Sequence, residues 1–366
     1  MPSEHAYLSP SAAHRWLHCP GSVGWEAELP DTTSDAAKEG TAAHALAEAR
    51  LKVDLELLWR VQQSEWYNAA MEGHIDTYVD YIHELRTPGD ELLIEQRLEI
   101  LPKCFGTADC LVVSEGKLDV VDLKYGKGVR VDAEQNPQCL LYAYGAWKAL
   151  SWLYDIQDVT VHIVQPRLDH ITSWHLTVDE MRQQVEGEEF QRHYQDAAHD
   201  VHEYHAGDHC RFCRAAPICR QRALHEVAKV AYALSEGGRD IGPTTVGYLL
   251  EVLPSFENWA KGIKDGALSA AIAGASIPGY KLVAGRGTRK ITNPTEAEAR
   301  LAEAGFDPAQ YMELRGLTDL EKAVGKKELS QVLDGLIVKS DGKPTLVKND
   351  DPRPAYSSAA EDFKEE

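Results

Sequence analysis

Hydrophobic and polar residues follow two different periods along this chain, and the switch between the periods outlines its elements. Residues 36–60 repeat Ala, Leu and Val at helical spacing, which predicts a long helix. A second helix is predicted over residues 65–86, ending before Thr87-Pro-Gly. From residue 91 the apolar residues alternate with polar ones or run together, as they do in half-buried and fully buried strands. The strands predicted there are 91–100, 107–114 and 117–123.

The middle of the chain takes up both periods in turn. Glu115-Gly116 separates the last two of these strands and is typical of a hairpin turn. Residues 133–150 predict another helix, and residues 159–165 and 171–177 predict two more strands. This order of helix, strands, helix and strand predicts an α/β fold in which a mixed central sheet is flanked by helices.

The last third of the chain predicts a helical C-terminal extension and then a disordered, acidic tail. Its predicted elements are helices at 221–236, at 244–273 with a break at Pro254 and at 294–304, one or two short helices within 317–336, and a short strand at 280–284. From Asp341 onward, prolines, glycines and many charges predict disorder. The domains expected are an N-terminal segment at 1–35, a core at 36–222, a mainly helical domain at 223–340 and the tail at 341–366.

Composition then bounds the class of protein. The 366 residues are 43% apolar, no window approaches the roughly 18 apolar residues of a membrane span, and the N-terminus has no export signal. We therefore expect a cytoplasmic protein without a membrane partner. A net charge of −20 argues against affinity for nucleic acid over the whole surface. Acid-free clusters of Arg and Lys within 211–222 and 281–290 still allow a local basic track.

Four of the seven cysteines form a metal-binding pattern. Cys210, Cys213 and Cys219 make a C-x2-C-x5-C run, and Cys19 stands far upstream in His-Cys-Pro-Gly. Because thiols stay reduced inside cells, clustered cysteines favour a metal over disulfides, and thiolates select zinc or an iron–sulfur cluster. A zinc ribbon normally has two C-x2-C knuckles, whereas three close cysteines and a remote one fit a 4Fe–4S cluster, with Zn²⁺ as the alternative.

Such a cluster would act as a staple. Cys19 would tie the N-terminal segment to the chain that follows the sheet, and the core would lie inside the loop so closed. Loss of the cluster should then loosen the fold rather than remove the chemistry directly. Two alternatives stay open: Cys19 is an unrelated core thiol, or a nearby histidine is a ligand instead, namely His18, His205 or His209.

A second pattern joins carboxylates to a lysine at the predicted strands. Asp109 lies in the second strand, and Asp122 ends the third, two positions before Lys124. Residues two apart in a strand face the same side, so Asp122 and Lys124 point into one site. Carboxylates hold Mg²⁺ or Mn²⁺, and the lysine can orient a water or stabilise developing charge. Taken alone, the pattern occurs by chance in most proteins and more often marks a surface aspartate and lysine at a strand end.

With these motifs in place, the chain resembles a known family. Four motifs stand in the order of the RecB-like branch of PD-(D/E)xK nucleases: Gly40-x3-His44, Gly106-Thr-Ala-Asp109, Asp122-Leu-Lys124 and Gln138-x3-Tyr142. The cysteines resemble the iron–sulfur form of this branch seen in AddB and in CRISPR-associated RecB-like exonucleases. Over residues 9–222 the chain is similar to a RecB-like family common in phages and prophages.

The resemblance implies a restriction-endonuclease-like core and a role for each matching residue. Lys124 would be the catalytic lysine, and Gln138 and Tyr142 would position the DNA strand near the site. The metal ligands would be His44, Asp109, Asp122 and the backbone carbonyl of Leu123. The ligands of the iron–sulfur cluster would be Cys19, Cys210, Cys213 and Cys219. Glu39 and Glu95 are candidates for additional carboxylate ligands.

The function implied is that of a DNA nuclease dependent on Mg²⁺ or Mn²⁺, most simply an exonuclease on DNA ends or single strands. Its expected setting is phage or prophage recombination, replication or DNA processing in a bacterial cytoplasm. The alternative is a noncatalytic DNA-binding subunit, or a partner-dependent subunit of a recombination or CRISPR-adaptation complex. Intact Asp109, Asp122 and Lys124 favour catalysis. A recombination or replication protein partner and a homo-oligomer both stay open.

Overall fold

The chain divides into two units in a computed structural model, Met1–Leu253 and Pro254–Glu366. The structure describes residues 6–30, 34–235, 241–307, 317, 320, 324–339, 342, 344–348 and 351–355. Each unit is considered by itself below. Among the described helices, none is long and apolar enough to cross a membrane.

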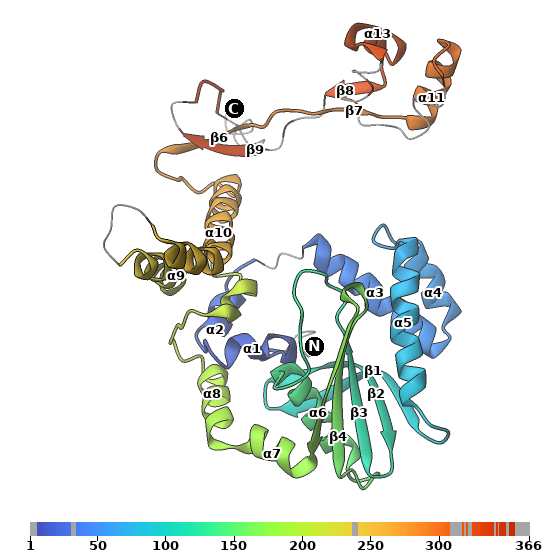
Figure 1. Ribbon diagram of the computed structural model, residues 1–366, viewed down its shortest axis with the longest axis vertical. Coiled ribbons are helices and arrows are strands. Elements are labelled where there is room, and N and C mark those ends of the chain that lie inside the picture. Colours follow the sequence, from blue (N-terminus) through green and yellow to red (C-terminus); the bar gives the residue numbers. More distant parts are fainter. Residues whose placement is uncertain are drawn as a thin grey trace, which may run out of the picture. The chain divides into compact units, whose positions relative to one another are not determined.

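The centre of the first unit is a mixed sheet, as the pattern predicts (Figure 1). In the described part of the chain it has five strands, in the order β1-β2-β3-β4-β5. They are β1 (Glu91–Leu101), β2 (Cys104–Ser114), β3 (Lys117–Leu123), β4 (Asp158–Gln165) and β5 (His170–Thr177). β3 and β4 are parallel, and the other neighbours in the sheet are antiparallel. The hairpin turn at Glu115-Gly116 is confirmed, with Gly116 at a φ of 81°.

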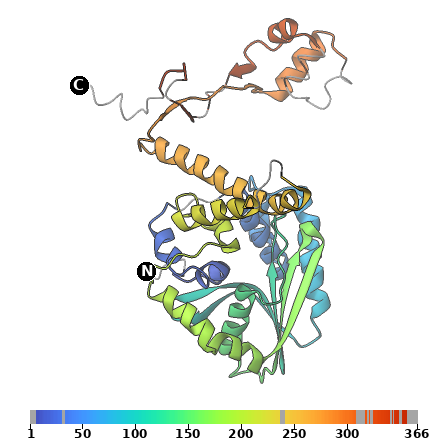
Figure 2. The same ribbon diagram turned by 60° about the vertical axis from the view of Figure 1, so that its left-hand side comes forward.

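Helices cover both faces of this sheet. Figures 1 and 2 show α3, α4 and α5 beside one face and α6 against the other. The helices of the first unit are α1 (Ala13–Trp16), α2 (Ser22–Ala27), α3 (Asp35–Lys52), α4 (Leu55–Gln62), α5 (Ala69–Leu85), α6 (Pro137–Leu150), α7 (Val178–Glu186), α8 (Glu188–Ala198) and α9 (Arg220–Ala233). Short 3-10 turns lie at η1 (Pro10–Ala12), η2 (Pro166–Leu168) and η3 (Asp208–Phe212).

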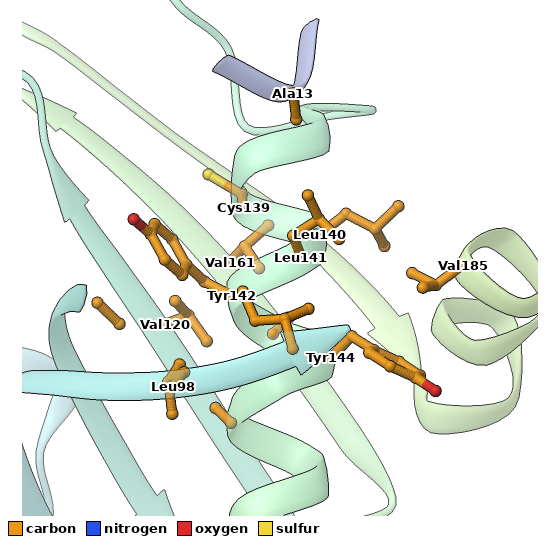
Figure 3. Close-up of a cluster of buried hydrophobic side chains, with 14 of the residues drawn as sticks. Ala13, Leu98, Val120, Cys139, Leu140, Leu141, Tyr142, Tyr144, Val161 and Val185 are labelled. Carbon is orange, nitrogen blue, oxygen red and sulfur yellow. The ribbon is translucent and has the colours of Figure 1, made fainter. Parts of the chain in front are cut away.

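Each face of the sheet has its own hydrophobic core. On the α6 side Val120 and Val161 pack against Leu141 (Figure 3), and on the other side Val121 packs in a cluster with Leu46 of α3. Successive strand residues point to opposite faces, so neighbours such as Val120 and Val121 enter different cores. Burial on both faces explains why β3 reads as an almost continuous apolar run.

A glycine lets α6 lie close to the edge of the sheet. A Cβ built on Gly145 would stand 2.7 Å from Cγ1 of Ile100, closer than real Cβ contacts come. At the other end of α6, Asn136 caps the helix by accepting hydrogen bonds from the N–H groups of Gln138 and Cys139. The helix therefore begins at Pro137, later than the predicted residue 133, and its first turn is fixed beside the end of the sheet.

The prediction of one helix over 36–60 is wrong, because the segment forms α3 and α4. α3 ends at Lys52, and Val53 takes a left-handed φ of 55°. Asp54 then begins α4 by accepting two hydrogen bonds of 3.0 Å from N–H groups of its first turn. Aspartate is a strong N-cap, so a helical pattern interrupted by a capping residue is better read as two helices.

The second unit holds small antiparallel sheets and helices. β6 (Tyr280–Ala284) pairs with β9 (Pro344–Lys348), and β7 (Arg289–Ile291) pairs with β8 (Ile337–Lys339). α11 (Pro294–Glu303) and α13 (Lys326–Val332) contribute to a small core with Leu301 and Leu329. The strand predicted at 280–284 and the helix predicted at 294–304 are confirmed, and α13 is a short helix of the kind predicted within 317–336, where residues 318–319 and 321–323 lie outside the described part of the chain.

Two predictions for this region are corrected. α10 (Pro243–Ile272) runs through Pro254 without the predicted break, since a proline removes one hydrogen bond of a helix but need not end it. The disorder predicted from Asp341 is contradicted at Pro344–Lys348, where each residue of β9 has a partner in β6. Residues 356–366 lie outside the described part of the chain.

Candidate metal centre

The candidate centre lies where β2 and β3 face each other at one end of the sheet. Their register pairs Cys110 with Val121, and one further step puts Asp109 opposite Asp122. Directly opposed residues on antiparallel strands present their side chains to the same face. Lys124 follows Asp122 by two positions, and its Nζ lies 2.8 Å from Oδ2 of Asp122. The strands therefore bring both carboxylates and the lysine to one place.

A helix and two strands contribute a compact group of possible metal ligands. His44 of α3, Glu95 of β1 and Asp109 of β2 each place a ligating atom within 4.8 Å of the other two. Nδ1 of His44 is 3.2 Å from Oδ1 of Asp109, and Oδ2 of Asp109 accepts a 2.7 Å hydrogen bond from the N–H of Leu123. These contacts hold the Asp109 carboxylate between α3 and β3.

Glu95 reaches this group through a strained backbone. The register pairs Ile94 with Cys110, so Glu95 lies opposite Asp109. Its φ is 53°, in the left-handed region, which costs a residue other than glycine about 1 kcal/mol or more. Conformations of this kind persist where the surrounding structure holds them, and they concentrate at functional sites.

Burial and the negative charge of Asp109 together shift the pKa values of the two neighbouring side chains in this group. Burial, and then the charge of Asp109, raise the pKa of Glu95 to about 7. Burial would lower the pKa of His44, but the charge and hydrogen bond of Asp109 outweigh it and raise the pKa to about 9. Without a cation, protons offset the negative charge of the group. Carboxylate oxygens with an imidazole are a donor set suited to ions such as Mn²⁺ and Mg²⁺, so the residues fit a divalent metal.

The ion pair of Asp122 and Lys124 is braced by Gln138 from the first turn of α6. Oε1 of Gln138 accepts a 2.8 Å hydrogen bond from Lys124, and Nε2 donates one of 2.8 Å to Oδ1 of Asp122. An ammonium group only donates and a carboxylate only accepts, so this orientation of the amide gives each of them one hydrogen bond. The three side chains form a closed network that points Lys124 toward the carboxylates.

Electrostatics keep Lys124 charged. Asp122 is 4% exposed, and this burial raises the pKa of its carboxyl group. Burial would lower the pKa of Lys124, but the charge of Asp122 outweighs it and raises that pKa. A permanently charged lysine can donate hydrogen bonds and stabilise negative charge, which are the two roles expected of it. It is not available as a base.

Tyr142 explains the glycine of the Gly106-x2-Asp109 motif. A Cβ built on Gly106 would stand 2.9 Å from the hydroxyl oxygen of Tyr142, so a side chain there would displace the ring. Tyr142 is 7% exposed and points from α6 toward the strands (Figure 3). Gln138 and Tyr142 thus share one face of α6, as their spacing predicts, and both are turned inward against the sheet.

The expected metal ligands divide into two sets. His44 and Asp109 belong to the compact group, together with Glu95, which was expected only as an additional carboxylate. Asp122 lies outside that group, and its oxygens face Lys124 and Gln138. Leu123 contacts Asp109 through its N–H, and the role expected for its carbonyl stays a prediction.

Glu39, the other additional carboxylate, is paired with a residue that the sequence analysis missed. Arg167 donates a 2.8 Å hydrogen bond to Oε2 of Glu39, and its guanidinium carbon lies 4.7 Å from the centre of the Tyr125 ring. Arg167 follows β4 and Tyr125 follows Lys124, and β3 and β4 are parallel neighbours. The arginine therefore ties the start of α3 to the end of the sheet that carries the site.

Gln165 was also missed, although it holds the loop after Lys124 in place. Its side chain is 1% exposed, accepts a 2.8 Å hydrogen bond from the N–H of Val131 and donates one of 2.9 Å to the carbonyl of Val129. A buried glutamine at the end of an apolar strand is a signal that could have pointed to such a role, because buried polar groups need partners.

Residues 203–219, called the cysteine segment below because they include Cys210, Cys213 and Cys219, contact the N-terminal helices. The N–H of Gly21 donates a 3.0 Å hydrogen bond to the carbonyl of Glu203, and Sγ of Cys19 lies 4.0 Å from the same oxygen. Glu26 of α2 accepts a 2.7 Å hydrogen bond from the N–H of Arg214, one position after Cys213. Cys19 thus lies against the segment that carries the other three cysteines. The four cysteines do not form a group as compact as that of His44.

Fold and site together define a mixed α/β protein with a candidate divalent-metal centre at one end of its central sheet. The chain belongs to the family described as "Protein of unknown function (DUF2800)", whose model matches residues 5–354. That match spans the sheet, the centre and most of the second unit.

Two solved structures are similar to this chain at low identity. A protein called SSO0001 is 15% identical, and the match covers 61% of this chain and 89% of that one, with a TM-score of 0.30. A "Putative exonuclease" from Eubacterium rectale is 12% identical, with 56% and 87% covered and a TM-score of 0.35.

Proposed function

We propose that this chain is a metal-dependent deoxyribonuclease with a RecB-like, restriction-endonuclease-like core. The convergence of His44, Glu95 and Asp109 beside the charged Lys124 supports this proposal. Hydrolysis of a phosphodiester requires neutralisation of the phosphate and activation of a water. A bound Mg²⁺ or Mn²⁺ would supply both. The substrate proposed is DNA with free ends or in single strands.

The residues of the chain would divide the remaining work. His44, Asp109 and Glu95 would hold the cation at the end of the sheet. Lys124 would donate a hydrogen bond to a phosphate oxygen as negative charge builds on that oxygen. Gln138 would hold the side chains of Lys124 and Asp122 in position. Because this network is in place before substrate arrives, little reorganisation is needed at the moment of reaction.

We also propose that Cys19, Cys210, Cys213 and Cys219 hold a 4Fe–4S cluster, with Zn²⁺ as the alternative. The contacts of Gly21 with Glu203 and of Glu26 with Arg214 support it, because they bring the remote cysteine to the other three. Analysis of iron, acid-labile sulfide and zinc in protein purified without oxygen tests this part. Zinc without iron would exclude the 4Fe–4S cluster and support a Zn²⁺ site at these cysteines.

Digestion of labelled DNA tests the nuclease. We expect linear and single-stranded DNA to be degraded with Mg²⁺ or Mn²⁺ and not with EDTA, and covalently closed circles to survive if the enzyme needs an end. Asp122→Asn and Lys124→Ala should each lower the rate by about 100-fold or more. Lys117→Ala is a matched control, because Lys117 also pairs with an aspartate two positions away on β3, at 2.9 Å.

The control variant should keep the wild-type rate. Wild-type rates in both site variants would overturn the proposal. Binding of DNA without cleavage under every metal tested would instead assign the chain to noncatalytic DNA-binding proteins.

A further inference from the structure

A groove with cationic and aromatic walls runs between α3 and α4. Its volume is about 390 Å³, within the range of ligand pockets in proteins. Its walls include Lys38, Thr41, Ala45, Leu57, Arg60 and Trp66. The proposed function assigns no role to any of these side chains. In this chain of net charge −20, the described residues of the groove include two cations and no acid.

Trp66 presents an aromatic face in this groove. The Nζ atom of Lys38 lies 5.1 Å from the centre of its ring, a cation–π contact. The backbone N–H of Trp66 donates a 3.2 Å hydrogen bond to Oγ of Ser64, which fixes the turn that carries the indole. The ring is half-buried and therefore oriented, whereas Lys38 is exposed and long enough to move aside.

The cations of the groove are weakly neutralised. Lys38 is 3.7 Å from Asp35, whose side chain is 82% exposed, and exposed pairs of this kind contribute little. Arg60 is exposed on the last turn of α4. An oriented aromatic face beside mobile cations is the arrangement that binds single-stranded nucleic acid, because bases stack on the ring and phosphates pair with the cations.

The groove and the candidate metal centre both use side chains of α3. Thr41 lines the groove, and His44 contacts Asp109 three positions later. Residues three apart on a helix are surface neighbours, with Cβ atoms about 5–6 Å apart. Thr41, a lining residue of the groove, therefore lies one helical turn from His44 on α3.

We infer that this groove binds one or two nucleotides of a single DNA strand next to the scissile phosphate, with Trp66 stacking on a base and Lys38 and Arg60 pairing with phosphates. The inference rests on the proposed nuclease function and adds to it the state of the substrate, which is unpaired at this point. A duplex would keep its bases stacked on each other and could not offer one to the ring.

Fluorescence anisotropy with a labelled oligothymidylate and the full chain in EDTA tests the inference, because EDTA separates binding from cleavage. Trp66→Ala should weaken binding by about 5- to 100-fold, and Trp66→Phe should retain most of it. Lys38→Glu and Arg60→Glu should each weaken binding and reduce its salt dependence, because each removes a cation that pairs with a phosphate. Both positions are exposed, so the two variants should fold normally. Trp152→Ala is the matched control, an indole that is 80% exposed elsewhere.

The outcomes separate this inference from the nuclease proposal. Equal affinities for Trp66→Ala, both charge reversals and Trp152→Ala would show that the groove does not bind DNA. The proposal of cleavage at the metal centre would then still stand. A Trp66→Ala effect as large on blunt duplex as on a single strand would overturn the assignment to unpaired DNA. A wild-type chain that neither binds nor cuts DNA would remove the nuclease proposal and the groove with it.

Discussion

The end of the sheet and the cysteine segment hold their chemical groups in different ways. At the sheet, strands β1, β2 and β3 fix Glu95, Asp109 and Asp122 by register. Asp109 is held directly, by the N–H of Leu123 at 2.7 Å and by His44 at 3.2 Å. At the cysteine segment, the contacts that bring Cys19 near the others are made mostly by neighbouring residues.

The difference matches the two roles proposed for metals in this chain. The sheet preorganises a centre whose parts touch before any ion arrives, which suits catalysis. The cysteine segment places two distant stretches of chain side by side, and an ion or cluster there would stabilise the fold. If this is correct, damage to one region should affect rate and damage to the other should affect stability.

The largest effect is expected at the cysteine segment. Cys213→Ser should lower the free energy of unfolding by about 3–5 kcal/mol, because loss of a structural metal is among the largest single-site effects. Thermal unfolding, together with metal content, measures it. Cys104→Ser is the control, since Cys104 is a fully buried thiol outside the set. The cleavage rate per folded molecule should stay near wild type, and a Cys213 variant with wild-type stability and metal content would contradict the staple.

A medium effect is expected in the pH dependence of metal affinity at the sheet. Ligands must lose their protons to bind a metal, and without one the pKa values of Glu95 and His44 are about 7 and about 9. Below pH 7 binding must displace both protons, between pH 7 and 9 only that of His44, and above pH 9 neither. Affinity for Mn²⁺ should thus rise with pH, by about 100-fold per unit well below pH 7 and by about 10-fold per unit between pH 7 and 9.

Calorimetric titration in buffers of different ionisation enthalpy checks both the slope and the number of protons released. Glu95→Gln removes one of the two protons and should flatten the dependence below pH 7. An affinity that is constant between pH 6 and 9 would show that these two side chains do not bind the ion.

The smallest effect is expected where α3 is tied to the sheet. Arg167→Ala removes the ion pair with Glu39 and should cost about 1 kcal/mol, with a several-fold lower cleavage rate because α3 carries His44. Arg182→Ala, which breaks an exposed pair with Glu186 on α7, is a matched control that should change neither quantity measurably. Equal rates in the two variants would show that the tie does not position the site.

Local patterns were enough for the parts of the site that lie close together in the chain. Asp122 and Lys124 share a face because strand residues two apart always do, and Gln138 and Tyr142 share one because α6 repeats every 3.6 residues. The hairpin at Glu115-Gly116 follows from the same kind of short-range rule. These features depend on neighbours within one turn or one strand, so periodicity suffices to find them.

Contacts between distant segments could not be predicted in this way. Glu95 joins the centre because the β1–β2 register sets it opposite Asp109 and its backbone turns left-handed, and neither feature has a local signal. Arg167 meets Glu39 across 128 positions, since the parallel pairing of β3 and β4 brings the end of β4 to the start of α3. The pattern of neighbouring residues in the sequence is enough to predict a helix or a strand. Strand register and the packing of helices on the sheet depend on distant segments, so they are decided only when the whole domain is assembled.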